Sequence, residues 1–210
     1  MNFFRRRLIA ILFITGVLLS TGVARLHAGE SSSGAEQFIT SLAAKAETFL
    51  LSDDISPIEH QRRFRELMIG SFDLKGVGKW VIGRYWRRAS QPERVKYLGL
   101  FERFVVATYS KRFRGYTKAK LVVNGSTKTK NSVFVNSQID RKGSKAIKII
   151  WRVQFSNGKY KITDIIIEGV SWIQTQRSEF VSVIRNNGGK VSGLMKALSK
   201  KIIYLTSSKS

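Results

Sequence analysis

The spacing of hydrophobic and polar residues changes twice along the chain. From about residue 36 to 114, apolar residues recur every three or four positions, which predicts helices. From about residue 119 to 167 they alternate with polar residues, which predicts strands. After Ser171 the helical spacing returns. Helices, then consecutive strands, then helices are typical of an α+β domain.

Local signals set the bounds of about six helices. Segments 56–59 (SPIE) and 90–93 (SQPE) are capping boxes, which open the second helix and the longest one. Asp73 is expected to cap a helix between them that ends at Gly83, and 187–189 (NGG) separates the last two helices. The predicted fold is therefore a four-stranded, twisted antiparallel meander wrapped by about six helices.

The last two predicted strands are joined by Asn157-Gly158, the dipeptide preferred in two-residue hairpin turns. The predicted register pairs Phe155 with Tyr160, Val153 with Ile162, Trp151 with Asp164, Ile149 with Ile166 and Ile147 with Glu168. One face of this hairpin is then almost entirely apolar, because residues directly opposite each other share a face. With the apolar stripe of the longest helix, that face forms an interior that is either a filled core or a cavity.

The residues of catalytic chemistry are scarce. The chain has no Cys and only two His, of which His60 is expected on a helix surface. Its 14 acidic residues are scattered and show no metal-ligand spacing. Asp164 and Glu168 break the apolar face, which indicates a bulge, a sheet edge or an opening towards a polar group. We expect no enzyme activity, no cofactor, no metal and no catalytic residue.

Residues 1–28 predict export. Three consecutive Arg precede an apolar stretch from Leu8 to Leu19, too short to span a bilayer comfortably, and small residues follow. This is typical of a signal peptide cleaved after Ala24 or Ala28, and it predicts a periplasmic protein. Cleavage after Ala28 removes four Arg, so the formal charge falls from +23 to +19. Export argues against nucleic acid as the partner of this charge, and favours anionic lipids or acidic protein surfaces.

Several segments together resemble the MlaC family of periplasmic phospholipid-binding proteins, also known as toluene-tolerance or ABC-transporter auxiliary components. They occur in family order at residues 64–65 (FR), 72–73 (FD), 83–87 (GRYWR), 109–116 (YSKRFRGY), 163–165 (TDI), 168–171 (EGVS) and 176–180 (QRSEF). The resemblance covers nearly all of the chain after the signal peptide. It implies a domain at residues 29–205, followed by a disordered tail at 206–210, with a deep apolar pocket for acyl chains.

The resemblance also implies a shuttle that carries phospholipid between an outer-membrane lipoprotein complex and an inner-membrane ABC transporter with an MCE-domain subunit. We expect the acyl chains to lie between the long helix and the sheet face, against Phe101, Phe104, Val105, Tyr109, Leu121, Val123, Val133, Val135, Ile147, Ile149, Trp151, Val153 and Ile166. Basic residues at the mouth, namely Arg84, Arg87 and Arg177, are expected to meet the phosphate.

Three alternatives stay open at the level of the sequence. The ligand could be a hopanoid or another lipid, because a hopanoid-associated subgroup looks similar. The protein could be a basic adaptor that coats anionic envelope polymers, with a filled core and salt-sensitive binding. It could also be an enzyme that uses a carboxylate such as Asp164 inside the pocket.

Overall fold

The computed structural model describes residues 31–50, 55–113, 120–141 and 144–207 of the 210-residue chain. The predicted signal peptide lies outside these ranges, as do residues 208–210 of the predicted tail. The elements run in the order α1 (Ser32–Leu50), α2 (Pro57–Ser71), α3 (Leu74–Ile82), α4 (Arg84–Arg88), α5 (Gln91–Phe113), β1 (Lys120–Lys128), β2 (Val133–Arg141), β3 (Ser144–Ser156), β4 (Lys159–Ile167), β5 (Val170–Ser171), α6 (Trp172–Asn186) and α7 (Val191–Ser207). The α+β prediction is confirmed.

The strands form one antiparallel sheet in the order β1-β2-β3-β4-β5. The predicted four-stranded meander is present, and the count is corrected to five by β5, whose two residues are too few to show alternation. The described part of the chain holds seven helices, because the five-residue α4 follows α3 directly. α7 continues through Ser207, two residues past the start of the predicted tail.

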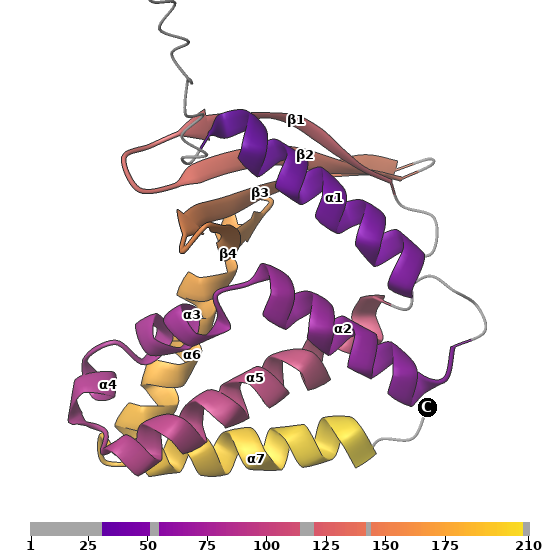
Figure 1. Ribbon diagram of the computed structural model, residues 1–210. Helices are drawn as coiled ribbons and strands as arrows, with labels where there is room; N and C mark the ends of the chain where they lie inside the picture. The colour runs from indigo at the N-terminus through magenta and orange to yellow at the C-terminus, as the bar shows by residue number, and fades with distance from the viewer. Residues whose placement is uncertain (1–30, 51–54, 114–119, 142–143, 208–210) are drawn as a thin grey trace, which may run out of the picture.

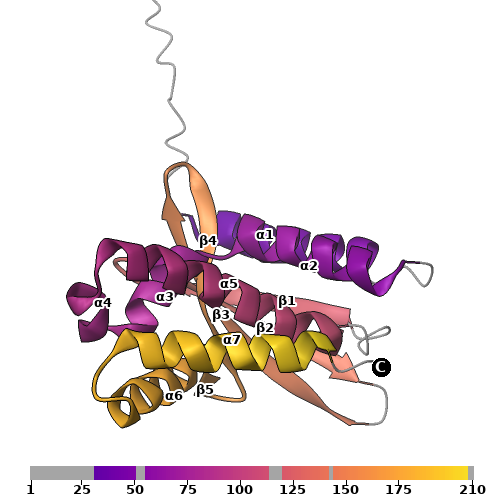
Figure 2. The same cartoon turned by 90° about the horizontal axis from the view of Figure 1, so that it is seen from below.

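The elements form two layers (Figure 1). The upper layer is the sheet with α1, which lies along β1 and β2. The lower layer holds α2, α3, α5, α6 and α7, and α5 and α7 lie side by side along most of their length (Figure 2). The helix with the most extensive contact to the sheet is thus α1, while α2, α3 and α6 contact β4. The longest helix, α5, packs against α2, α3 and α7.

The predicted caps are confirmed. Ser56 accepts a hydrogen bond from the Glu59 backbone N–H at 3.2 Å, and Asp73 accepts one from Gly76 at 2.9 Å. Glu93 accepts a hydrogen bond from the Ser90 backbone N–H at 2.9 Å, in the reciprocal arrangement of a capping box. These bonds satisfy N–H groups that the first turn of a helix leaves without a partner.

The hydrophobic core is continuous from the sheet into the helical layer. Val133, Val153 and Ile162 from the sheet and Phe101 from α5 are all fully buried in it. His60 is also buried, with 2% of its surface exposed, so its expected surface position is wrong. It lies four residues before Phe64 on the inward side of α2, a spacing that places both residues on one face.

Candidate functional site

The apolar face predicted for the sheet exists. β2 and β3 pair so that the predicted residues of these strands stand opposite one another and share a face, namely Val133 with Val153, Val135 with Trp151, Ser137 with Ile149 and Ile139 with Ile147. β1 adds Leu121 opposite Ile139, and Val123 opposite Ser137. The structure therefore brings together the predicted site residues of β1, β2 and β3.

The predicted register fails beyond Ile162. Val153 faces Ile162 as expected, but Arg152 faces Asp164, so Thr163 is an extra residue in β4. An extra residue moves every later side chain to the other face of the sheet. Ile165 therefore stands opposite Trp151 on the apolar face. Ile166, which the sequence assigns to that face, pairs with Ile150 on the opposite one.

The same bulge explains the buried carboxylate of Asp164. Its Oδ1 accepts hydrogen bonds from the backbone N–H groups of Ile165 at 2.8 Å and Ile173 at 3.1 Å. Its Oδ2 accepts a bond from the Ser171 hydroxyl at 2.6 Å. Asp164 thus holds the start of α6 on the sheet and does not share a face with Trp151. The bulge, rather than an opening towards a polar group, accounts for this residue.

Glu168 also leaves the apolar face. It lies in the turn between β4 and β5, with a φ of 48°, and its side chain is exposed. Its Oε1 accepts a hydrogen bond from the backbone N–H of Lys148 at 2.6 Å. Both acidic residues are therefore accounted for by local backbone contacts, at a bulge and at a turn.

Burial differs between the two ends of the apolar face. At one end, Val133, Val153 and Ile162 stand side by side on three neighbouring strands and are fully buried. At the other end, three residues in the same relation across β1, β2 and β3 are only half-buried, namely Leu121, Ile139 and Ile147. We call these the closed end and the open end. Apolar side chains that pack on a core and still meet solvent are the feature of an accessible apolar site.

Trp151 and Ile165 lie between the two ends. Both are half-buried and pack against the core. The indole N–H of Trp151 donates to the Ser137 hydroxyl at 2.8 Å, and that hydroxyl lies 3.2 Å from the Ile149 carbonyl, to which it donates. The polar atoms of this part of the face are therefore paired within the sheet, and only hydrocarbon and ring surface is left for contact.

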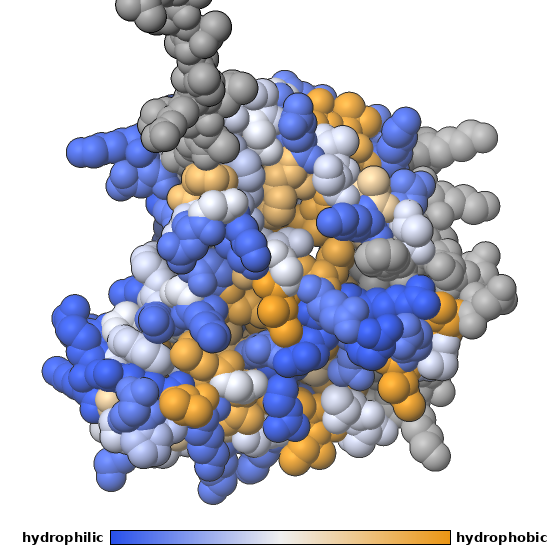
Figure 3. Space-filling view, viewed as in Figure 1, coloured by the Kyte–Doolittle hydropathy of each residue, from blue (hydrophilic) through white to orange (hydrophobic). Residues whose placement is uncertain are grey.

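The space-filling view shows where apolar surface reaches the outside. Near the centre of Figure 3 the surface is hollowed between the layer of the sheet and α1 above and the helices below. Apolar residues line this hollow, and hydrophilic residues surround it. The hollow lies at the boundary between the two layers (Figure 3).

The helical side of the interior contains more aromatic residues than predicted. Phe101 and Phe104 are buried, as expected for the stripe of α5, and both rings contact Phe180 of α6, with centroids 6.1 and 5.7 Å apart. Tyr109 is half-buried and accepts a hydrogen bond from the Trp172 indole N–H at 2.5 Å. The sequence prediction assigns no site role to Trp172 or Phe180, because α6 is separated from α5 by the whole sheet.

The three arginines predicted at the mouth are not gathered at the hollow. Arg84 and Arg87 are exposed on α4, which lies at one end of the helical layer (Figures 1 and 2). Arg177 is half-buried on α6; it donates a hydrogen bond to the Trp80 carbonyl and stacks over the Trp80 ring at 4.7 Å. Arg177 thus binds the last turn of α3 to α6.

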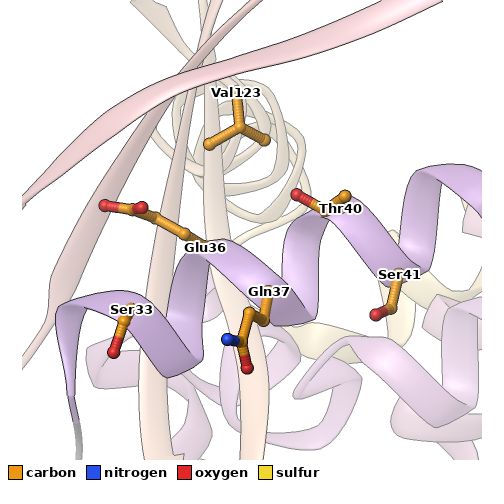
Figure 4. A pocket seen from close by; sticks show the side chains of 6 residues that line it. All are labelled: Ser33, Glu36, Gln37, Thr40, Ser41 and Val123. Atoms are coloured by element: carbon orange, nitrogen blue, oxygen red, sulfur yellow. The ribbon is translucent and has the colours of Figure 1, made fainter.

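A groove of about 390 Å³ lies between α1 and β1, at the edge of the sheet that carries Val123 of the apolar face. It is lined by Ser33, Glu36, Gln37, Thr40 and Ser41 from α1 and by Val123 from β1 (Figure 4). Glu36 accepts a hydrogen bond from the Ser126 hydroxyl at 2.6 Å. Because five of its six lining side chains are polar, this groove is unsuited to hydrocarbon, and the open end of the apolar face is the better candidate.

Within the described ranges, no three His, Cys, Asp or Glu side chains lie close enough together to hold a metal ion. Across the same residues, no helix combines the length and the apolar character needed to cross a bilayer.

Comparison with known proteins shows the family of the chain. A family model described as MlaC protein matches residues 42–200, which is more than half of the chain. The chain therefore belongs to the MlaC family. A relative from Haemophilus influenzae, named intermembrane phospholipid transport system binding protein MlaC, is 20% identical over 139 residues. That match covers 63% of this chain and 65% of the relative, slightly less than two thirds of its length.

A solved structure has the same fold. It is a phospholipid-binding protein from Ralstonia solanacearum in complex with a phospholipid. The superposition gives a TM-score of 0.74 at 18% sequence identity, and it covers 82% of this chain and 99% of the other. At this level of identity the likeness extends to the fold, and the ligand is a property of that protein.

Proposed function

We propose that this protein binds phospholipid, with the acyl chains against the open end of the sheet face and the polar headgroup towards solvent. The observation that carries the proposal is the half-buried row formed by Leu121, Ile139 and Ile147, continued by Trp151 and Ile165. Of these residues, Leu121, Trp151 and Ile165 pack against the core while part of their surface stays exposed.

The energetic reason for such a protein is the cost of moving lipid through water. Two acyl chains of roughly 15 methylenes each, at ~0.8 kcal/mol per methylene, cost on the order of 24 kcal/mol to expose. A carrier lowers this cost by offering apolar surface in place of the bilayer. The named Haemophilus influenzae relative and the phospholipid complex from Ralstonia solanacearum support phospholipid as the ligand.

We further propose that the protein is exported by its N-terminal segment and shuttles phospholipid between the outer and inner membranes. An outer-membrane lipoprotein complex and an inner-membrane MCE-domain ABC transporter are the proposed partners. Support comes from the basic and apolar pattern of residues 1–28, and from the family, in which the named relative belongs to an intermembrane transport system. The proposed role is binding and transport without catalysis.

The direct test is native mass spectrometry of the protein purified without detergent, followed by lipid extraction. We expect a bound mass that matches one phospholipid or more and that survives high salt, because hydrocarbon contacts are not screened by ions. An apo mass alone, under conditions in which a known lipid carrier keeps its ligand, would end the proposal.

A matched pair of variants locates the site. Ile165→Glu and Ile166→Glu make the same change at adjacent half-buried residues whose side chains lie on opposite faces of β4. Ile165→Glu should lose bound lipid, because it places a carboxylate against the acyl chains. Ile166→Glu should keep it. Equal lipid occupancy in two folded variants would show that the apolar face is not the binding surface.

A further inference from the structure

The end of the helical layer around α4 carries a dense cluster of exposed positive charge. Between residues 75 and 96 the sequence has seven basic residues and one acidic residue, Glu93. The carboxylate of Glu93 accepts hydrogen bonds from Ser90 in the cap of α5, and these bonds lower its pKa. Six of the seven basic side chains are exposed, namely Lys75, Lys79, Arg84, Arg87, Arg88 and Lys96.

In the described part of the chain, the arginines of α2, unlike the cations around α4, form ion pairs with carboxylates. Arg62 and Arg63 form ion pairs with Glu59, and Arg65 forms one with Glu102. Among the residues that the structure describes, no carboxylate forms an ion pair with any of the six exposed cations around α4. Their charge is therefore available to an external anion.

The turn between α6 and α7 extends the same surface. A methyl group at Gly189 in this turn would lie 3.9 Å from the ring of Tyr85, so the turn lies against α4. Arg185 and Lys190, on either side of the turn, are both exposed. We call the cations of α3, α4, the start of α5 and this turn the basic end. Hydrophilic residues dominate the surface of this region (Figure 3).

Two tryptophans accompany these cations. Trp80 is 43% exposed, and the Arg177 guanidinium lies over its ring. Trp86 is half-buried, with Lys79 at 5.5 Å and Arg94 at 5.2 Å from its ring. Exposed Trp beside Lys and Arg is the composition of surfaces that lie in the headgroup region of a bilayer, where the indole is interfacial and the cations meet phosphate.

We infer that the basic end is a docking surface for anionic phospholipid bilayers. This goes beyond the proposed carriage of a single lipid, and it gives Arg84 and Arg87 the phosphates of a membrane surface as partners. Docking through this end would leave the hollow between the two layers at the side of the bound molecule. An acidic protein surface is the competing partner. The bilayer is favoured by the type of cation, because Lys is depleted at protein interfaces and three of the six exposed cations around α4 are Lys.

The test is flotation of the purified protein with vesicles of neutral phosphatidylcholine, alone or with 30% phosphatidylglycerol. We expect binding only to the anionic vesicles, at low salt and not at 0.5 M NaCl, because salt shortens the range of the attraction. The variant Lys79→Glu/Arg88→Glu/Lys190→Glu should bind at least about 100-fold more weakly, since the loss of each cation near an anionic surface costs roughly fivefold and the new carboxylates add repulsion. None of the three is a predicted contact of the carried lipid.

The control variant is Lys45→Glu/Lys145→Glu/Lys159→Glu. It changes the net charge by the same amount at exposed residues of α1, β3 and the start of β4. It should bind anionic vesicles within about threefold of the wild type, because the attraction falls off within a Debye length. Equal weakening of both variants would overturn the inference in favour of a diffuse effect of net charge.

Absence of wild-type binding to anionic vesicles would also overturn the inference, and would leave an acidic protein as the partner. Lipid occupancy measured by native mass spectrometry on the same preparations separates this result from failure of the carriage proposal. Should the glutamate variant fail to fold, Lys79→Gln/Arg88→Gln/Lys190→Gln tests the same cations by neutralisation, with about 100-fold weakening expected.

Discussion

Asp164 offers a sharp test of how α6 is held on the sheet. Its carboxylate is 5% exposed and accepts three hydrogen bonds, from Ile165, Ser171 and Ile173. Ser171 in turn accepts the backbone N–H of Gln174 at 3.2 Å, as the N-cap of α6. Replacing Asp164 by Ala removes every acceptor at once and leaves the buried N–H of Ile173 without a partner.

The size of the effect follows from these contacts. A hydrogen bond to a charged group contributes about 1.5–3 kcal/mol, and a buried donor left unpaired costs about 1–3 kcal/mol. Ser171 is half-buried and can bond to water instead, so we expect Asp164→Ala to lower the free energy of unfolding by about 3 kcal/mol. For a domain of this size that corresponds to a Tm lower by roughly 6–12 °C.

Asp164→Asn should be milder. The amide oxygen can accept the two backbone N–H groups, and the amide nitrogen can donate to Ser171. What is lost is the strengthening of these bonds by charge, about 1 kcal/mol. Neither variant should change lipid occupancy, because Asp164 stands opposite Arg152 and not on the face of Trp151.

The assay is urea unfolding at equilibrium, with the slope compared between variants. Asp140→Ala is the control, because it removes an exposed carboxylate from β2 and should change stability by less than about 0.5 kcal/mol. An Asp164→Ala protein as stable as that control would refute the argument for α6. A variant that keeps its stability and loses a chemical activity would instead support the enzyme alternative.

Two further predictions concern backbone and charge. Gly83 joins α3 to α4 with a φ of 52°, and a Cβ there would lie 2.7 Å from the Arg177 guanidinium, so Gly83→Ala should lower the free energy of unfolding by about 1–3 kcal/mol. Gly99→Ala on exposed helix surface of α5 is the control and should raise it by up to about 1 kcal/mol; equal effects would contradict the backbone argument. Hydrogen bonds from Arg62 and Arg63 lower the pKa of Glu59 to about 2. Because the unfolded value is about 4.3, this pairing stabilises the fold above that pH and is lost as the pH falls towards 2. Glu59→Gln should therefore flatten the pH dependence of unfolding in that range, and an NMR titration that gives Glu59 a pKa above 4 would contradict this.

The parts of the fold that could be predicted are those set by neighbouring residues. The capping boxes at Ser56 and Ser90 and the stop at Gly83 depend on a few adjacent side chains, and all three are present. The Asn157-Gly158 turn is also present, with φ of 52° and 75°. Each of these sequence patterns depends on a local hydrogen bond or a backbone angle. It could therefore be predicted without knowledge of any contact distant in the sequence.

The errors arise where a distant contact decides the outcome. The bulge at Thr163 depends on Asp164 reaching the start of α6, which no property of the hairpin itself requires. It exchanges Ile166 for Ile165 on the apolar face. The direct cover of the sheet by α1, and the contacts of α6 with the aromatic stripe of α5, likewise depend on how separate segments pack.

The closed end and the open end of the sheet face differ in burial. This difference explains how one face can contribute both to stability and to ligand binding. Apolar surface that is kept open for a ligand contributes little to folding until the ligand is bound. The closed end of the face, with Val133, Val153 and Ile162, is continuous with the aromatic contacts of α5 and α6, so this half can hold the two layers together without a ligand. The fold then does not depend on burial of the open end for its stability. Water can replace the lipid's acyl chains at that end while the protein stays folded. A face that was half-buried along its whole length would instead make folding depend on the cargo, and such a carrier would unfold each time it released its lipid.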